Sequence, residues 1–286
     1  MIIRYKVEEE GYRIKRYLEK KGMSDQVFKS IRSGNGQYLV NDQIVDNHYL
    51  LHIGDLLEVV MPASDQGENI VSVMGEFEIV YEDSYLIVIN KEPNLACMPT
   101  KEHFTNSLAN YVMSYYKRNG ILSNIHLVSR LDAPTSGLIM LAKTPYMTSL
   151  LQNTLITKKY LLETTNVVTP SEGIIELGIL KDENSVIKRY TTTDFINSKT
   201  VYKTLDVKNN HSIIEALLCT GKTHQLRLHF LSKNAPIVGD LLYGEETTSD
   251  ILHLHSYYLE FIHPITKENI ILTTYPSWYE KKAKEE

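Results

Sequence analysis

The chain has 286 residues, of which 43% are hydrophobic and 23% are charged, and its formal net charge is −5. This length suggests about two domains, and aliphatic and aromatic residues throughout the chain exclude a mainly disordered protein. Cys97 and Cys219 lie far apart without a C-x-x-C pair, which excludes a disulfide framework or a thiolate zinc site. Neither a signal-peptide pattern nor a long apolar run is seen, so we expect a cytoplasmic protein without a membrane segment.

The first 62 residues are expected to form a small separate unit. Residues 11–34 hold seven basic and two acidic residues. Two short helical patterns occur here, the second from near Ser24 to Gly34, and strand-like runs follow at 38–40, 44–45 and 56–60. A tight turn is expected directly after Val40. Basic residues at i, i+3 and i+7 predict one charged helix face, away from the apolar pair Ile14 and Leu18. A basic segment of this kind can bind nucleic acid even in an acidic protein, and the candidate contact residues in this unit are Arg13, Arg16, Lys20 and Arg32.

A polar linker is expected over residues 63–76, and a second unit over 77–286. Residues 137–142 are apolar on both faces, which predicts a central strand covered on both sides. Thr144 and Pro145 are typical of a helix start, and the apolar spacing that follows predicts a helix that ends near Thr157. Residues 159–163 are then expected to form a strand.

The stretch from Ser129 to Lys143 places Asp132 in a polar loop directly before that central strand. In this position the carboxylate is available for chemistry at the mouth of a sheet. From the local sequence alone, the commoner arrangement is a turn aspartate whose side chain accepts N–H bonds from Thr135 or Ser136.

Several motifs occur in one order along the chain. The stretch that contains Arg130-Leu-Asp-Ala-Pro-Thr-Ser-Gly-Leu138 resembles the R-L-D-x-x-T-S-G-L signature of the RluA-type pseudouridine synthases. The other blocks that resemble this family are Val88–Lys91 with Leu95 and Pro99, Lys158-Lys-Tyr160, Thr220-Gly-Lys-Thr-His-Gln-Leu-Arg-Leu-His229, Pro236–Asp240 with Tyr243-Gly244, Leu254-His-Ser256 and Phe261-Ile-His-Pro264. The chain departs from the family pattern at Ser129, at Lys222 and at Asn94, where asparagine tolerates the left-handed backbone of the usual glycine.

The resemblance implies the roles of the candidate catalytic residues. Asp132 is the essential carboxylate, which acts as a nucleophile or as a base at the sugar. Arg227, expected one turn into a helix capped by Thr223, is implied to be the ion-pair partner of Asp132. Tyr160 is implied to stack on the flipped base and to be a candidate acceptor of the ring-carbon proton in the last step. Because a free tyrosine is a poor base at neutral pH, we expect stacking to be its main role. From the residues alone, Arg227 fits a surface salt bridge and Tyr160 an ordinary packing residue equally well.

The resemblance also implies the fold and the partners. We expect an α+β pseudouridine synthase domain with a mixed, largely antiparallel sheet, preceded by a small unit that resembles the S4 RNA-binding domain. Such an enzyme isomerises specific uridines in structured RNA, ribosomal or transfer RNA, and needs no cofactor. Arg130 and Lys222 are further candidates for RNA contact, and we expect a monomer.

Three alternatives compete with this interpretation. His253, His255 and His263 have the composition of a metal cluster, but no carboxylate stands at a suitable spacing, so we expect no metal site. A non-catalytic RNA-binding factor would have no reason to retain Asp132, Tyr160 and Arg227 together. A glycoside hydrolase needs two carboxylates that flank one bond, and no convincing second acid is found.

Overall fold

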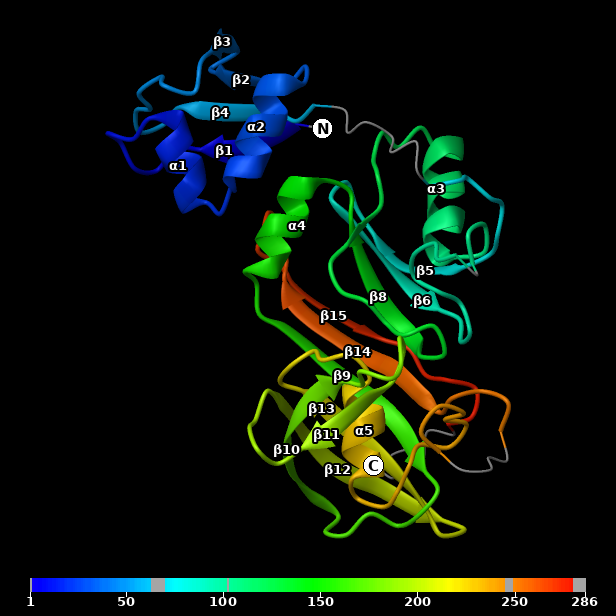
Figure 1. Ribbon diagram of the computed structural model, residues 1–286. Coiled ribbons are helices and arrows are strands. Elements are labelled where there is room, and N and C mark those ends of the chain that lie inside the picture. Colours follow the sequence, from blue (N-terminus) through cyan, green and yellow to red (C-terminus); the bar gives the residue numbers. More distant parts are fainter. Residues whose placement is uncertain (1, 63–69, 102, 245–248, 280–286) are drawn as a thin grey trace, which may run out of the picture.

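The structure is a computed structural model that describes residues 2–62, 70–101, 103–244 and 249–279. It contains two sheets, one in the N-terminal unit (residues 2–62) and one in the remaining described chain (Figure 1). The expected linker 63–76 lies outside the described residues as far as residue 69. The rest of it is held against helix α3 (Leu108–Arg118), because the Val73 N–H donates to the Asn110 carbonyl oxygen at 3.2 Å.

Four antiparallel strands and two helices form the N-terminal unit. Their bounds are β1 (Ile2–Lys6), α1 (Ile14–Lys20), α2 (Asp25–Ser33), β2 (Gln37–Val40), β3 (Gln43–Val45) and β4 (Leu56–Val60), with strand order β1-β4-β2-β3. Helix α2 begins directly after Ser24 and ends directly before Gly34, as predicted. The predicted turn after Val40 is also confirmed, since Asn41 and Asp42 have φ values of 50° and 66°, as a two-residue hairpin turn requires. Strand β1 was not predicted.

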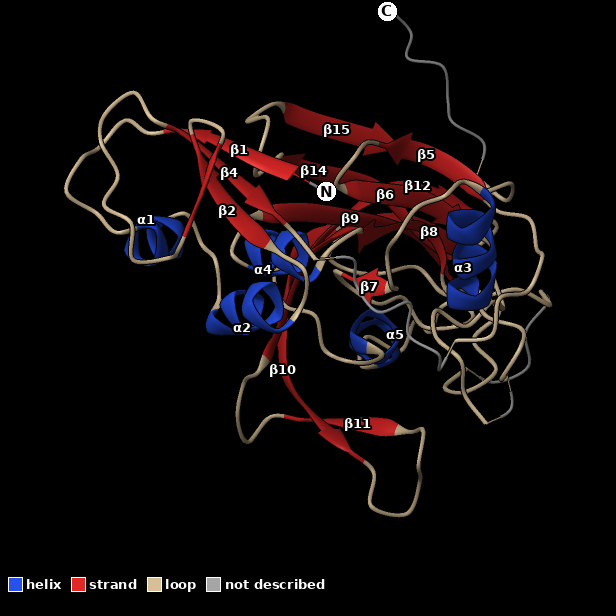
Figure 2. Ribbon diagram, turned by 90° about the horizontal axis from the view of Figure 1, so that it is seen from above, coloured by secondary structure: helices blue, strands red, loops and turns tan. Residues whose placement is uncertain are grey.

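A second, larger sheet has eleven strands in the order β11-β10-β12-β13-β9-β14-β8-β6-β5, with β15 beside β14 and β7 beside β8. The strands are β5 (Glu78–Glu82), β6 (Leu86–Lys91), β7 (His126–Leu127), β8 (Ser136–Ala142), β9 (Ile156–Thr164), β10 (Glu172–Lys181), β11 (Arg189–Thr192), β12 (Ser198–Lys208), β13 (His211–Leu218), β14 (Leu254–Ile262) and β15 (Asn269–Thr273). Among the strand pairs of the described chain only β8 and β14 run parallel, so the expected mixed, largely antiparallel sheet is confirmed. The β10–β11 hairpin projects away from the rest of this sheet (Figure 2).

Strand β8 is buried along its whole length, as the double-sided apolar pattern predicted. It begins directly after the Asp132 loop and pairs with β14 through His255 and Ser256. At Gly137 the φ angle is 105°, and a Cβ there would lie 2.4 Å from the Ser256 carbonyl oxygen. The close approach of β8 and β14 therefore depends on the missing side chain.

The two faces of the large sheet are covered by different elements. Leu138 and Met140 of β8 belong to one apolar cluster, together with residues of helix α4 (Pro145–Gln152). Ile139 and Leu141 belong to another cluster, which includes α3 and helix α5 (Gln225–Leu231). None of the helices in the described ranges is both long and apolar enough to cross a lipid bilayer.

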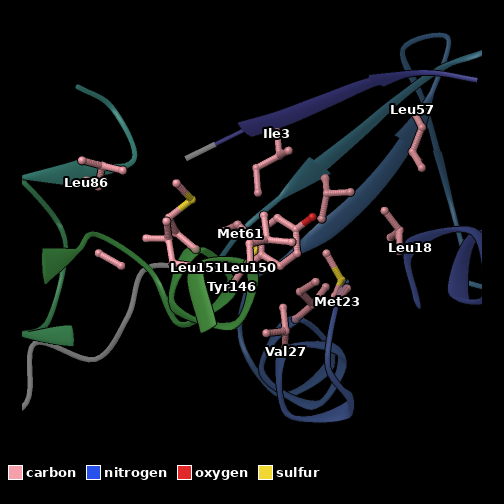
Figure 3. Packing of buried hydrophobic residues seen from close by; sticks show 14 of the residues in the cluster. Ile3, Leu18, Met23, Val27, Leu57, Met61, Leu86, Tyr146, Leu150 and Leu151 are labelled. Atoms are coloured by element: carbon pink, nitrogen blue, oxygen red, sulfur yellow. The ribbon is translucent and has the colours of Figure 1, made fainter. Parts of the chain in front are cut away.

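The N-terminal unit packs against helix α4. Ile3, Met23 and Val27 share one buried cluster with Leu150 and other residues of α4 (Figure 3). The hydroxyl groups of Tyr5 and Tyr146 are hydrogen-bonded, and the Ser149 hydroxyl donates to the Gly22 carbonyl oxygen at 3.3 Å. The N-terminal unit and the large sheet are therefore joined by a continuous apolar core.

The start of α4 agrees with the sequence and its end does not. Thr144 caps the helix by accepting the Met147 N–H at 3.1 Å, and Pro145 is the first helical residue. The helix ends at Gln152, five residues before the predicted end near Thr157. Leu155 continued the apolar spacing, but its side chain is 87% exposed, and the chain has entered β9 by the next residue.

Candidate active site

A cavity of about 540 Å³ is lined by residues of the loop before β8, of β9, of the loop between β13 and α5, and of α5. Its walls include residues 128–132, residues between 151 and 160, and residues 218–227. Asp132, Tyr160 and Arg227 all line it, so the structure brings together the three side chains that the family resemblance singled out.

Asp132 presents its carboxylate to this cavity. The Thr135 N–H donates to the backbone carbonyl oxygen of Asp132 at 3.0 Å. The turn is thus closed by the backbone, and the alternative of a carboxylate used up in capping the turn does not hold for Thr135. The side chain is 27% exposed, which leaves it accessible to a ligand.

Lys91 anchors the loop that carries Asp132. Its buried ammonium group donates to the carbonyl oxygens of Glu92, Leu95 and Ala133 at 2.8, 2.9 and 3.0 Å. Burial lowers the pKa of Lys91 to about 8. Because Ala133 follows Asp132 directly, this lysine ties the loop to the end of β6. The sequence showed Lys91 only as part of a family block, without this role.

Tyr160 lies in β9, opposite Ala216 of β13 and Ser256 of β14. Its ring is buried among apolar residues and also lines the cavity. Burial raises the pKa of Tyr160 to about 12, and the negative charge of Asp132 acts in the same direction. The phenol is therefore protonated at neutral pH, which favours a stacking role over that of a base.

The expected ion pair between Arg227 and Asp132 is wrong for this structure. The Arg227 guanidinium binds Asp240 through two hydrogen bonds, of 2.7 Å from Nε and 2.6 Å from Nη2. Its side chain is buried, so it is not a surface salt bridge either. A buried guanidinium needs a carboxylate of matching fork geometry, and Asp240 supplies it.

The ionisable side chain that faces Asp132 instead belongs to His224, with its Nε2 atom 3.8 Å from Asp132 Oδ2. His224 has a left-handed backbone with φ 58° and occupies the N-cap position of α5, so Thr223 is not the cap that the sequence predicted. The T-G-K-T-H block contained this histidine, but nothing in the spacing distinguished it from its neighbours.

Three cationic side chains surround the cavity without carboxylate partners. Arg130, Lys158 and Lys222 all line it, and the described part of the chain has no carboxylate within ion-pair distance of their side-chain nitrogens. Burial lowers the pKa of Lys158 to about 8, so it remains mostly charged at neutral pH. An unneutralised cation cluster favours a polyanionic ligand. Arg130 and Lys222 were predicted for RNA contact, whereas Lys158 was not.

His253, His255 and His263 each have a different side-chain partner. His253 binds Glu163 at 2.7 Å, His255 binds Ser136 at 2.8 Å, and His263 lies 3.1 Å from Asp83. Among the residues with described positions, no group of three or more His, Cys, Asp or Glu side chains is arranged to hold a metal ion.

The basic residues of the N-terminal unit lie outside the cavity lining. Arg13 precedes α1, so only Arg16 and Lys20 of the expected helix face are helical. Arg16 pairs with Glu19 at 3.2 Å, and Lys20 pairs with Glu9 at 2.6 Å. Arg13 and Arg32 are exposed.

A family model for RNA pseudouridylate synthases matches residues 85–232. The chain is 33% identical over 263 residues to the uncharacterized RNA pseudouridine synthase YjbO of Bacillus subtilis, covering 90% of this chain and 93% of the relative. It is 31% identical to ribosomal large subunit pseudouridine synthase D of Neisseria meningitidis serogroup A, with 82% and 67% covered. The dual-specificity RNA pseudouridine synthase RluA of Vibrio cholerae is 32% identical, with 65% and 78% covered.

Solved structures agree on the fold. Human RNA pseudouridylate synthase domain containing 4 superimposes with a TM-score of 0.57 at 24% identity, covering 70% of this chain and 89% of the human chain. The motifs from Val88 to Pro264 thus lie on the fold that they implied. The chain belongs to the RluA-type RNA pseudouridine synthases, isomerases that act on RNA.

Proposed function

We propose that this chain isomerises specific uridines of structured ribosomal or transfer RNA, with Asp132 as the essential carboxylate. The observation that carries the proposal is one cavity that combines a partly exposed carboxylate, a buried tyrosine and three unpaired cations. The relative from Neisseria meningitidis is named for the large ribosomal subunit, which makes ribosomal RNA the first substrate to test.

The reaction is balanced within the nucleotide. The bond from ribose C1′ to ring N1 breaks, the base turns, C1′ bonds to ring C5, and the C5 proton is lost while N1 gains one. Asp132 supplies the nucleophile or the base at the sugar. Tyr160, neutral at neutral pH, offers a stacking surface to the flipped base. Within the lining residues that the structure describes Asp132 is the sole carboxylate, which disfavours a two-carboxylate glycoside hydrolase.

The cation cluster supports RNA as the ligand of the cavity. Arg130, Lys158 and Lys222 are suited to the phosphates that flank a target uridine. The N-terminal unit extends this surface as an S4-like RNA-binding unit, through Arg13, Arg32 and, when released from their acidic partners, Arg16 and Lys20. We further propose that the enzyme works as a cytoplasmic monomer.

Asp132→Asn tests the role of the carboxylate. The change removes the nucleophile and little contact surface, so pseudouridine formation should fall by about 10⁴-fold or more while RNA affinity stays nearly the same. The measurement is pseudouridine in a transcript of large-subunit ribosomal RNA after incubation with each protein. Turnover above a few per cent of the wild-type rate would refute the assignment of Asp132.

A further inference from the structure

We propose that His224 is a positioning residue for the Asp132 carboxylate and that Tyr243 selects the ring tautomer that does this. The inference rests on the proposed function of Asp132. It gives His224 the place that the sequence assigned to Arg227, which Asp240 holds away from Asp132.

The first support is the geometry between the two side chains. His224 Nε2 lies 3.8 Å from Asp132 Oδ2, and both residues line the same cavity. The His224 side chain is only 9% exposed, so the imidazole has a fixed setting. Within the described chain no other Lys, Arg or His nitrogen lies within ion-pair distance of this carboxylate. At 3.8 Å the contact is longer than a direct hydrogen bond, and a small closure on RNA binding would complete it.

The second support is the backbone of His224. At φ 58° and ψ 21°, His224 has a left-handed conformation that residues with a Cβ disfavour. This conformation turns the chain from the 220–223 loop into α5, where the Leu228 N–H donates to the His224 carbonyl oxygen at 3.0 Å. Such strain persists where a site needs a particular side-chain direction, and here the direction is toward Asp132.

The third support is the partner of the other ring nitrogen. His224 Nδ1 lies 2.7 Å from the Tyr243 hydroxyl. That hydroxyl oxygen already accepts the Arg189 N–H at 2.9 Å. The Tyr243 hydroxyl then donates its own proton to His224 Nδ1. With Nδ1 as the acceptor, the neutral imidazole carries its hydrogen on Nε2. The nitrogen that lies 3.8 Å from Asp132 Oδ2 is therefore the one that carries the hydrogen.

The charges around the ring agree with a neutral donor. Burial lowers the pKa of His224, and the guanidinium groups of Arg227 and Arg189 act in the same direction, against Asp132 and Asp240. Arg227 also lies over the Tyr243 ring, 5.0 Å from its centroid. Asp240 in turn accepts the Tyr243 N–H at 3.1 Å. The buried pair Arg227–Asp240 thus holds Tyr243, Tyr243 holds His224, and His224 faces Asp132.

Four variants test this arrangement in the full-length enzyme: His224→Ala, His224→Gln, Tyr243→Phe and the double variant His224→Gln/Tyr243→Phe. The substrate is a transcript of large-subunit ribosomal RNA. His224→Ala should lower kcat by about 10- to 100-fold with KM changed by less than about threefold, because the carboxylate loses its orientation. His224→Gln should recover much of this loss, since its amide N–H can occupy the place of Nε2–H.

Tyr243→Phe should lower kcat by about three- to tenfold in the wild-type background and have almost no further effect in the His224→Gln background. A glutamine has no tautomer to select, so the two changes should be coupled. Thermal unfolding of each variant verifies that it is folded. If Tyr243→Phe lowers kcat by the same factor in both backgrounds, tautomer selection is refuted.

The result that overturns the role of His224 is a folded His224→Ala enzyme with kcat within about twofold of wild type. Failure of the proposed function looks different, because wild type and Asp132→Asn would then give the same rate. An active wild type, an inactive Asp132→Asn and a fully active His224→Ala would refute only the inference about His224.

Discussion

The Asp83 carboxylate accepts several hydrogen bonds around the turn between β5 and β6. Its Oδ1 atom accepts the Tyr85 and Leu86 N–H groups at 2.6 and 2.8 Å, and its Oδ2 atom accepts the Tyr81 hydroxyl at 2.9 Å. His263 Nε2 lies 3.1 Å from the same Oδ2 atom. The Nδ1 atom of His263 accepts backbone N–H groups, so the Nε2 atom of this histidine carries the proton. Asp83 thereby connects the β5–β6 turn to the end of β14.

The pKa of Asp83 predicts an acid-sensitive contribution to stability. Burial tends to raise this pKa, but the hydrogen bonds from His263, Tyr85, Leu86 and Tyr81 outweigh burial and lower it to about 2. A carboxyl whose pKa is depressed in the folded state stabilises the fold above its unfolded pKa of about 3.9, and this stabilisation is lost as the pH falls toward 2.

Asp83→Asn should therefore lower the free energy of unfolding by about 1–2 kcal/mol at pH 7, a value discounted for solvent screening. The difference from wild type should shrink as the pH falls from about 4 toward 2. Urea unfolding at several pH values measures it. Asp25→Asn is the control, because the Asp25 side chain is 76% exposed, and its effect should be small. A difference for Asp83→Asn that does not change with pH would contradict the prediction.

At the scale of elements, the meeting of β8 and β14 places the cavity. Leu254 of β14 and Thr135, just before β8, both line it. Gly137 permits the strands to approach, since a Cβ there would lie 2.4 Å from the backbone of Ser256. The family signature thus contains a glycine for a packing reason that has no direct part in the chemistry.

Gly137→Ala should destabilise the protein by about 3 kcal/mol or more, because the strands must separate and the alanine must adopt φ near 105°. Chemical denaturation measures this. Gly221→Ala is the matched control, since a Cβ at Gly221 meets nothing within 4 Å. Equal stabilities of the two variants would show that β8 and β14 can move apart at no cost.

The elements that the sequence predicted well are those whose signals are local. The Thr144–Pro145 start, the buried strand β8 and the turn after Val40 each carry their cause in adjacent residues. Asn94 also has the expected left-handed backbone, with φ 58°. Strand β1 was missed because only Ile3 of its apolar residues is fully buried, and its partner β4 is remote in the chain. Asp240 was missed as the partner of Arg227 for a similar reason, because it follows α5 in the chain. It binds the guanidinium group that the sequence assigned to Asp132.

At the scale of the whole molecule, the N-terminal unit is docked through an apolar interface. A Cβ at Gly22 would lie 2.9 Å from Leu150 Cδ2, and the shared cluster covers one face of α4. The C-terminal end of the same helix, at Leu151 and Gln152, lines the cavity. A substitution that shifts α4 at this interface would therefore also move residues that line the active-site cavity.

Leu150→Ala should lower stability by about 2–4 kcal/mol through the cavity that it leaves. It should also raise amide hydrogen exchange in residues 2–62 more than in the large sheet, because the unit loses its support. Leu155→Ala, at a leucine that is 87% exposed, is the matched control. Equal exchange in the two variants would mean that the docking surface contributes little.

The N-terminal unit should also contribute to the salt dependence of RNA binding. If Arg13 and Arg32 contact phosphates, Arg13→Gln/Arg32→Gln should reduce the slope of log affinity against log salt by about 1.4–1.8. Arg4→Gln/Lys6→Gln removes the same charge from β1 and should change the slope less. An unchanged slope in the first double variant would mean that the basic residues are only a solvated surface.

The place of β14 in the large sheet has a consequence for folding. It lies between β9 and β8, yet β8 comes from residues 136–142 and β14 from residues 254–262. During synthesis, a chain that has emerged only as far as α5 has the Asp132, Tyr160 and His224 side chains but not the strand that joins their supports. Such long-range pairing forms slowly and late, and domains larger than about 150 residues commonly pass through intermediates. The active site should therefore be among the last parts of the molecule to form, so that an incompletely folded chain has no competent cavity for RNA.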